Sequence, residues 1–293
     1  MTTHTNKPII GLIGTGVMGK SMAGHLINAG YEVHVYTRTQ SKAQDLLERG
    51  AKWQASPGDL AAECQIIMTM VGFPSDVEEV YFGENGILAR AQAGSYLIDF
   101  TTSSPSLAKL IYKEGLARQL FALDAPVSGG DIGAREARLS IMVGGSHEVF
   151  NEMLPIFKLM GTNIVHQGAA GAGQHTKMCN QIAIASNMMG VVEALVYAKK
   201  AGLNPSTVLQ SIETGAAGSW SLSNLGPRMI ADNFAPGFYV KHFIKDMKIA
   251  LQSAEEMQVD LPGLKLAKSL YEQLAAMGEE ESGTQALYKL INK

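Results

Sequence analysis

The sequence predicts an α/β protein in which a doubly wound parallel sheet is followed by an all-α C-terminal part. Two observations predict this arrangement. In the first half, strand-like runs alternate with helical patterns, as in a parallel sheet covered on both faces. Beyond residue 169 no convincing strand pattern follows, and helical patterns fill the rest. We therefore expect one domain over residues 1–169 and a second over residues 170–293, which begins with a long interdomain helix.

The opening unit, residues 9–38, reads as a strand, a glycine-rich turn, a helix and a second strand. In the G-x-G-x-x-G turn, Gly14 allows a tight bend, Gly16 lets backbone amides approach a pyrophosphate, and Gly19 lets the helix lie close to the sheet. The phosphates would lie at the positive end of the helix. This context favours a Rossmann-type dinucleotide site over a merely structural turn. The expected contacts of the turn are Gly14, Thr15, Gly16, Val17, Met18 and Gly19.

The end of the second strand indicates which dinucleotide is bound. An NAD site usually has an Asp or Glu there for the ribose 2′-hydroxyl. This chain instead has Arg38 and Thr39, followed by Lys42. A guanidinium, a hydroxyl and an ammonium suit a 2′-phosphate, so we expect NADP, with NAD possible. The alternative is that Arg38 and Lys42 are ordinary solvated charges at the start of a helix.

Further strands are expected at residues 65–71, 96–100, 121–125, 139–143 and 163–166. The carboxyl ends of parallel strands line one crevice in an open α/β sheet. Met70 and Val71 follow one strand and are expected to cover the nicotinamide. Thr102 lies in a run of hydroxyl residues after the next strand. Those hydroxyls could equally form an N-cap cluster for a helix that starts at Pro105.

The stretch DAPVSGG, residues 124–130, is a candidate site for a carboxylate. Ser128, Gly129 and Gly130 would present consecutive backbone N–H groups beside a hydroxyl. A flexible glycine turn would look similar.

The long helix expected over residues 173–200 carries a polar stripe made of Gln174, Lys177, Asn180 and Gln181. Spacings of three and four place these residues on one face, which suggests a wet cleft. The Lys177 ammonium could donate a proton to an alkoxide that forms on hydride transfer. Lys245 could supply a second positive charge and bind a substrate carboxylate. Both lysines could equally be solubilising surface residues, with Lys245 and Asp246 at the exposed start of a helix.

After this helix, ended by Gly202, shorter helices are expected at residues 205–214, 222–232, 242–257 and 264–277.

Composition restricts the possible partners. The net charge of −3, without a Lys/Arg run, argues against nucleic acid. The two cysteines, Cys64 and Cys179, lie in apolar segments and are expected to be reduced core residues. The N-terminus lacks a signal pattern, and the apolar runs are broken before membrane-spanning length. We therefore expect a cytoplasmic protein with no membrane partner and no metal site.

Four motifs together resemble the β-hydroxyacid dehydrogenase family, which includes 3-hydroxyisobutyrate dehydrogenase and tartronate semialdehyde reductase. They are GLIGTGVMGKSMA, DAPVSGG, GAGQHTKMCNQ and KDMKIAL, in this order along nearly the whole chain. The resemblance implies that Lys177 is the catalytic lysine and that Asn180 orients the substrate. It implies a substrate-carboxylate loop at Ser128, Gly129 and Gly130, a lysine lining the substrate and cofactor site at Lys245, and a hydroxyl beside the nicotinamide at Thr102.

The resemblance also implies an NAD(P)-dependent enzyme acting on a small 3-hydroxy acid or its semialdehyde, assembled as a homodimer or homotetramer. Two positions depart from the family pattern. His25 and Gln181 both stand where Asn is usual. The first is expected to affect packing behind the glycine loop, and the second the contacts around the substrate. A dinucleotide-binding sensor or scaffold without catalysis, and an imine reductase on the same fold, are the alternatives.

Overall fold

The computed structural model describes residues 7–292. Residues 1–6, on which the expectation about a targeting signal falls, and residue 293 lie outside the described residues. Contacts divide the chain into two compact units, one ending at Lys177 and the other beginning at Met178. The division falls inside helix α9 (Ala172–Lys200), whereas the sequence places the domain boundary after residue 169.

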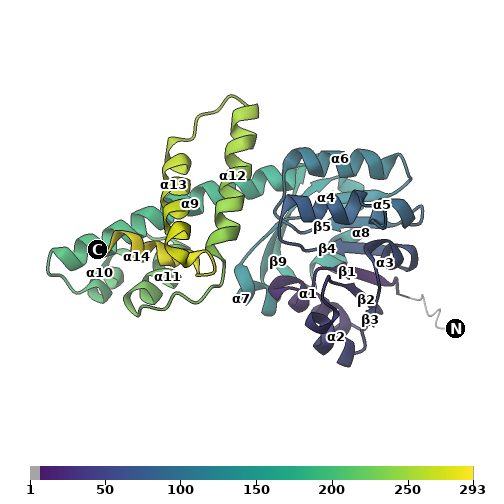
Figure 1. The fold of residues 1–293 in the computed structure, drawn as a ribbon, viewed down its shortest axis with the longest axis horizontal. Coiled ribbons are helices and arrows are strands. Elements are labelled where there is room, and N and C mark those ends of the chain that lie inside the picture. Colours follow the sequence, from purple (N-terminus) through teal and green to yellow (C-terminus); the bar gives the residue numbers. More distant parts are fainter. Residues whose placement is uncertain (1–6, 293) are drawn as a thin grey trace. The chain divides into compact units, whose positions relative to one another are not determined.

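The first unit is built on a nine-stranded sheet (Figure 1). Its strands are β1 (Ile10–Ile13), β2 (Val33–Tyr36), β3 (Lys52–Trp53), β4 (Ile66–Thr69), β5 (Tyr96–Asp99), β6 (Phe121–Asp124), β7 (Val127–Ser128), β8 (Leu139–Gly145) and β9 (Gly161–Gly168). Their order is β3-β2-β1-β4-β5-β6-β8-β7, with β9 also paired to β8. The predicted class, an α/β sheet followed by helices, is confirmed.

The sheet is not parallel throughout, which corrects the prediction. Strands β1 to β6 pair in parallel, but β8 runs antiparallel to both β6 and β7. A parallel connection needs a crossover of about a dozen residues or more. Only residues 129–138 separate β7 from β8, so β8 returns in the opposite direction.

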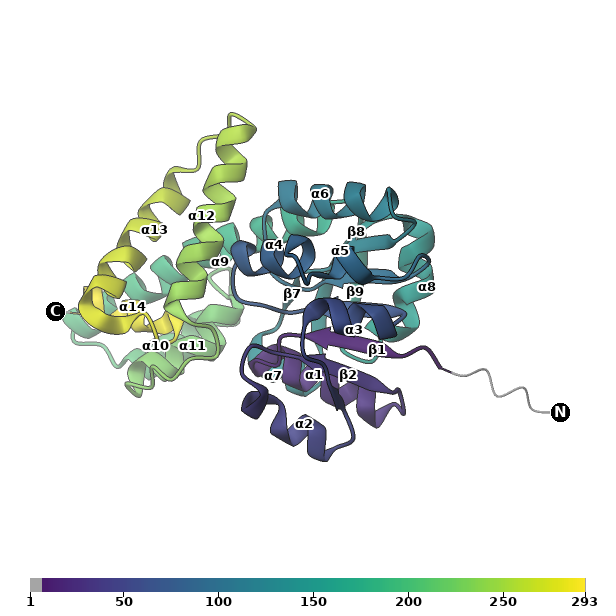
Figure 2. The ribbon, with the colours of Figure 1, turned by 45° about the vertical axis from the view of Figure 1, so that its right-hand side comes forward.

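Helices cover both faces of this sheet (Figure 2). One face packs against α1 (Val17–Asn28), α2 (Gln44–Glu48), α7 (Gly130–Arg135) and α8 (His147–Phe157). The other packs against α3 (Pro57–Glu63), α4 (Pro74–Phe82), α5 (Ile87–Arg90) and α6 (Pro105–Leu116). Successive strand residues point to opposite faces. Leu12 therefore belongs to the first core and Ile13 to the second.

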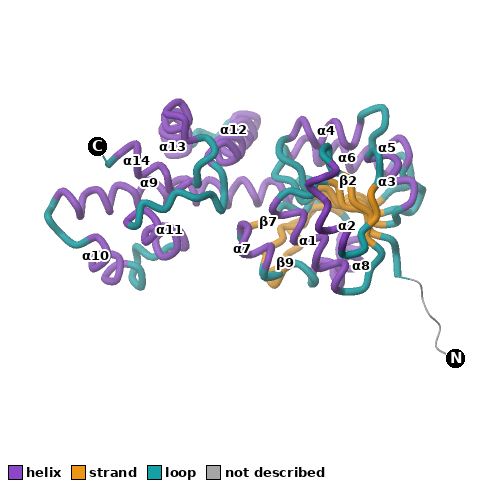
Figure 3. The backbone as a smooth tube through the Cα atoms, turned by 60° about the horizontal axis from the view of Figure 1, so that its bottom comes forward, coloured by secondary structure: helices purple, strands orange, loops and turns teal. Residues whose placement is uncertain are grey.

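The second unit is helical in its described part, apart from a single bridge between Tyr239 and Gly283 (Figure 3). After α9 come α10 (Pro205–Ile212), α11 (Trp220–Ile230), α12 (Val240–Glu256), α13 (Pro262–Leu274) and α14 (Leu287–Ile291). The predicted helices are therefore present, with ends that differ by a few residues. Phe243, Met247 and Tyr271 are fully buried in the core of this unit.

Two expectations for α9 need correction. By length and composition this helix is apolar enough to cross a membrane, so its apolar run is not broken as expected. Met188, Val192 and Leu195 of α9 are nevertheless part of the core of the second unit, and core helices pass the same test. Cys64 is buried as expected, but Cys179 on α9 is exposed. The apolar composition around Cys179 does not show which way it faces, because only one side of the helix meets the core.

Candidate active site

The glycine-rich turn joins β1 to α1 and has the geometry of a phosphate-binding loop. Gly14 has a positive φ of 98°, and a Cβ there would collide with the Met70 carbonyl oxygen. A Cβ on Gly19 would collide with the Gly14 carbonyl oxygen, so the helix lies directly against the turn. At Gly16, by contrast, a Cβ would meet nothing within 4 Å. Backbone amides beside an open position are what a pyrophosphate requires.

The Thr15 side chain supports the same conclusion. It is only 3% exposed, and within the described part of the chain its Oγ1 atom has no hydrogen-bond partner. A buried hydroxyl without a partner is costly, so it usually has a functional reason. A hydroxyl available as a donor beside Gly14 and Gly16 fits a bound phosphate. Val17 is exposed and Met18 is half-buried at the start of α1.

Arg38, Thr39 and Lys42 are all exposed, at the end of β2 and the start of the following 3-10 turn (Gln40–Ala43). Arg38 Nη1 lies 3.4 Å from Asp76 Oδ1, and Asp76 Oδ2 accepts a hydrogen bond of 3.0 Å from Phe73 N. A carboxylate from the first turn of α4 therefore lies beside the end of β2 and pairs with Arg38. Sequence reasoning missed Asp76, because only the fold places the loop after β4 beside the end of β2.

The loops after β4 and β5 are linked by Thr101. Its Oγ1 atom accepts a hydrogen bond from Val71 N at 3.0 Å, and its own N–H donates to Asp99 Oδ1 at 3.0 Å. Ser104 accepts from Leu107 N at 3.1 Å and is the N-cap of α6. The run of hydroxyls thus includes a helix cap, as one of the two interpretations expected. Thr102, like Met70 and Val71, is half-buried.

The first turn of α9 is anchored to the carboxyl end of β6. Asp124 Oδ1 accepts from Gly171 N at 2.7 Å, and Asp124 Oδ2 accepts from Gln174 N at 2.8 Å. These bonds satisfy N–H groups that a helix start leaves unpaired. Lys177 follows in the next turn and is 7% exposed, so the alternative of a solubilising surface lysine does not hold.

The polar stripe of α9 is not a wet surface, which corrects the expectation. Gln174 is 0% exposed and Gln181 is 1% exposed. The Gln174 amide binds backbone groups of Thr101 and Ser103, and the Gln181 amide binds the side chains of Asn180 and Asp246. Buried amides are stable when their groups are paired in this way.

Two buried carboxylates lie side by side at the ends of β5 and β6, since Asp99 and Asp124 are register partners. Burial raises the pKa of Asp99 to about 6, although hydrogen bonds from Thr69 and Thr101 oppose the rise, and the Asp124 charge adds to it. Burial also raises the pKa of Asp124, against the hydrogen bonds from Gly171 and Gln174. Sequence reasoning assigned neither carboxylate a role.

The predicted carboxylate loop lies at the end of β7. Ser128 is half-buried and is the register partner of Ser140 on β8. Gly129 and Gly130 both have positive φ, 134° and 62°, and Gly130 begins α7. His25 on α1 contacts the same helix through a 2.8 Å hydrogen bond between its Nε2 and the Ala134 carbonyl oxygen. This bond joins α1 to α7, and the expected effect of His25 on packing behind the glycine loop stays a prediction.

The second unit has its own buried polar network at the start of α12. Gln181 Nε2 donates to Asp246 Oδ2 at 2.6 Å, and Asn180 Nδ2 donates to Gln181 Oε1 at 2.7 Å. Lys245 Nζ lies 2.8 Å from Asp246 Oδ1. Asp246 is 1% exposed and the Lys245 side chain 12%, so an exposed helix start is ruled out for both. Gln181 thus connects Asn180 to Asp246.

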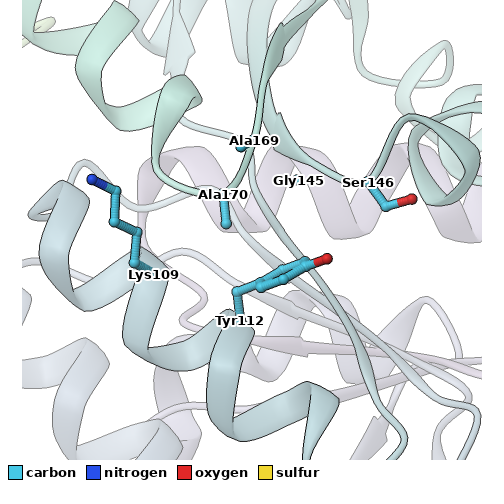
Figure 4. A pocket seen from close by; sticks show the side chains of 6 residues that line it. All are labelled: Lys109, Tyr112, Gly145, Ser146, Ala169 and Ala170. Carbon is cyan, nitrogen blue, oxygen red and sulfur yellow. The ribbon is translucent and has the colours of Figure 1, made fainter.

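A separate open cavity of about 560 Å³ lies beside α6 (Figure 4). It is lined by Lys109, Tyr112, Gly145, Ser146, Ala169 and Ala170. None of these is a predicted site residue, so the volume of this cavity does not identify the active site.

The fold and these residues define an NAD(P)-dependent oxidoreductase. Residues 9–168 match the family model of the NAD-binding domain of 6-phosphogluconate dehydrogenase. Residues 171–291 match the model described as NAD-binding of NADP-dependent 3-hydroxyisobutyrate dehydrogenase. The chain belongs to the 3-hydroxyisobutyrate dehydrogenase family, also called the β-hydroxyacid dehydrogenase family.

Relatives of known name cover almost the whole chain. An uncharacterised oxidoreductase, YkwC, from Bacillus subtilis is 65% identical and is matched over 97% of this chain and 99% of its own. The 2-hydroxy-3-oxopropionate reductase of Escherichia coli is 40% identical, with 96% of each chain covered. Among solved structures, Mycobacterium tuberculosis 3-hydroxyisobutyrate dehydrogenase with L-serine has a TM-score of 0.90 at 28% identity. That match covers 98% of this chain and 99% of the other.

Proposed function

We propose that the protein interconverts a small 3-hydroxy acid and its semialdehyde, with NADP as the preferred dinucleotide and Lys177 as general acid and base. The observation that carries this proposal is the position of Lys177. It is a buried lysine, one turn beyond the hydrogen bonds that join α9 to the ends of β5 and β6. A relative that reduces 2-hydroxy-3-oxopropionate supports the substrate class.

When bound, the nicotinamide cofactor supplies or accepts a hydride at the substrate carbon. In reduction, the Lys177 ammonium donates a proton to the substrate oxygen and stabilises the negative charge that develops there. In oxidation, the neutral Lys177 amine accepts the hydroxyl proton. The turn from Gly14 to Gly19, with the Thr15 hydroxyl, holds the pyrophosphate.

The substrate carboxylate is held by the Ser128 hydroxyl and the backbone N–H groups of Gly129 and Gly130. Both glycines have positive φ, a backbone conformation that side chains disfavour, so this loop requires glycine at both positions. Asn180 orients the substrate, and Lys245 adds positive charge for its carboxylate. The ion pair with Asp246 fixes the Lys245 side chain, and the hydrogen bond that Asn180 Nδ2 donates to Gln181 Oε1 fixes the Asn180 side chain.

The test offers NADPH and NADH with tartronate semialdehyde, succinic semialdehyde and glyoxylate, and the oxidised cofactors with 3-hydroxyisobutyrate. We expect wild-type turnover with at least one substrate, faster with NADP(H). Lys177→Ala should lower kcat a hundredfold or more, on the order of 3 kcal/mol of activation free energy, because a general acid is lost.

The matched control is Lys109→Ala, since Lys109 is an exposed lysine of the same unit. It should retain wild-type kcat. Undiminished turnover in Lys177→Ala would remove the mechanism. Dinucleotide binding without turnover across the whole panel would favour a sensor or scaffold instead.

A further inference from the structure

Gln174 uses both ends of its side-chain amide inside the first unit. Its Oε1 atom accepts a hydrogen bond from Ser103 N at 2.9 Å, and its Nε2 atom donates to the Thr101 carbonyl oxygen at 2.7 Å. The side chain is fully buried. The two backbone groups that it binds lie on either side of Thr102, so Gln174 fixes the loop that carries the predicted nicotinamide contact.

The backbone of Gln174 is fixed independently of its side chain. Its N–H donates to Asp124 at the end of β6, next to the bond that Gly171 makes to the same carboxylate. Gln174 is therefore a junction of three segments: the loop after β5, the end of β6 and the first turn of α9. All three belong to the first unit.

Gln174 and Lys177 are three residues apart on α9. This spacing places them on adjacent turns of one face, separated by about 4.5 Å along the helix axis. A shift of the loop after β5 relative to α9 would therefore change the distance from Thr102 to Lys177. The Gln174 amide opposes such a shift, because it binds backbone groups on both sides of Thr102.

We propose that Gln174 is a positioning residue for the reaction, which holds the loop bearing Thr102 in register with the proton donor Lys177. This inference rests on the proposed function of Lys177. Proximity effects depend steeply on geometry, and a displacement of about 1 Å can lower a rate roughly a hundredfold. The residue type follows from the contacts. An amide offers a donor to the Thr101 carbonyl and an acceptor to Ser103 N–H, whereas a carboxylate offers only acceptors.

The first test is Gln174→Met, which keeps the length of the side chain and removes both hydrogen bonds. We expect kcat to fall roughly tenfold to a hundredfold, with KM for cofactor and substrate changed less than about threefold, because alignment rather than binding is lost. The primary deuterium isotope effect on kcat, measured with cofactor deuterated at the transferred position, should rise as the chemical step becomes limiting. A merely structural role would lower the thermal stability and leave kcat per folded protein unchanged.

The second test is Gln174→Glu, which remains informative if the Met variant does not fold. The ionised Glu keeps the acceptor for Ser103 N–H but faces the Thr101 carbonyl without a donor. Once protonated, it regains an O–H donor and reproduces the amide pattern. The kcat of this variant, relative to wild type at the same pH, should therefore recover as the pH is lowered. If the ratio of the kcat of Gln174→Glu to that of wild type does not change with pH, the proposal is wrong.

Thr176→Ala is the matched control, since Thr176 Oγ1 donates a hydrogen bond to the Ala172 carbonyl oxygen of its own helix. It should keep the wild-type kcat and isotope effect. Lys177→Ala is measured in parallel to separate the two hypotheses. If Lys177→Ala is inactive while Gln174→Met retains the full kcat and the wild-type isotope effect, the positioning role of Gln174 is wrong and the proposed function of Lys177 stands. If Lys177→Ala is fully active, the proposed function is wrong.

Discussion

The charge at the end of β2 is set by Arg38, which follows β2, and Asp76 in the first turn of α4. Arg38 is 78% exposed on its side chain, and its guanidinium lies 3.4 Å from the carboxylate of Asp76, which is 17% exposed. A 2′-phosphate would bind Arg38 in competition with this carboxylate and would be repelled by its charge. We therefore propose that Arg38 favours NADP and that Asp76 reduces this preference.

The variant Asp76→Asn tests this competition. The Asn side-chain oxygen can still accept the hydrogen bond from Phe73 N, so the start of α4 keeps its partner. An exposed ion pair contributes about 0.5–1 kcal/mol, so the KM for NADPH should fall roughly two- to fivefold while that for NADH stays unchanged. Steady-state kinetics with both cofactors provides the measurement.

Arg38→Ala is the companion variant and should raise the KM for NADPH without affecting that for NADH. A rise in the NADPH KM of Asp76→Asn would contradict the competition. It would show that Asp76 orients Arg38 for the phosphate.

Sequence motifs predict some residues of the candidate site. They do not reveal the residues that hold those motif residues in place. Lys177, Ser128 and the glycine turn stand in short patterns whose chemistry can be read directly. Asp124 and Gln174 act on backbone groups 47 to 73 residues away in the chain. No local pattern distinguishes such a side chain from an ordinary polar residue, because its partners are chosen by the fold.

At the scale of elements, the start of α9 packs directly against the sheet through backbone atoms. A Cβ on Gly173 would collide with the Met142 carbonyl oxygen and would lie 2.6 Å from the Asp124 carbonyl oxygen. A Cβ on Gly144 would lie 2.5 Å from Asp124 Oδ1 and 2.7 Å from Gly173 N. The helix can therefore approach β6 and β8 closely enough for Asp124 to bind its N–H groups only because both positions lack side chains.

Gly173→Ala should lower the free energy of unfolding by about 2 kcal/mol or more, because backbone atoms must shift to accommodate the methyl group. Gly190→Ala on the same helix is the matched control, since a Cβ there meets nothing within 4 Å. It should raise the free energy of unfolding by roughly 0.5–1 kcal/mol through helix propensity. Urea unfolding of both variants makes the comparison. Equal effects of the same sign would show that the close approach at Gly173 has no energetic consequence.

Helices and strands with a clear pattern of apolar residues could be predicted from the sequence. Very short strands could not. Residues 66–69 and 96–99 form strands within the predicted runs, because buried parallel strands are almost continuously apolar. Strands β3 and β7 have two residues each and are too short to show a period. The antiparallel direction of β8 follows from the length of the preceding connection and not from its own composition, which resembles that of a parallel strand.

For the whole molecule, the two units have separate hydrophobic cores, and the alternation of patterns along the chain was sufficient to predict both. Composition gave no indication that the first unit buries charge. Asp99 and Asp124 are each 5% exposed at the ends of neighbouring strands. Such carboxylates couple the stability of the fold to pH, because the folded and unfolded chains bind protons differently.

Burial raises the pKa of Asp99 from 3.8 to about 6, so the folded protein favours the protonated form of this carboxyl. The resulting stabilisation is fully present below about pH 4 and is lost as the pH rises through 6, a change of about 3 kcal/mol in the free energy of unfolding. Asp99→Asn removes this contribution, and its oxygen can still accept from Thr69 Oγ1 and Thr101 N. The free energy of unfolding of the variant, minus that of wild type, should therefore increase by about that amount between pH 4 and pH 7. Urea unfolding across this range provides the measurement, and a difference that stays constant with pH would show that Asp99 keeps an ordinary pKa in the folded protein.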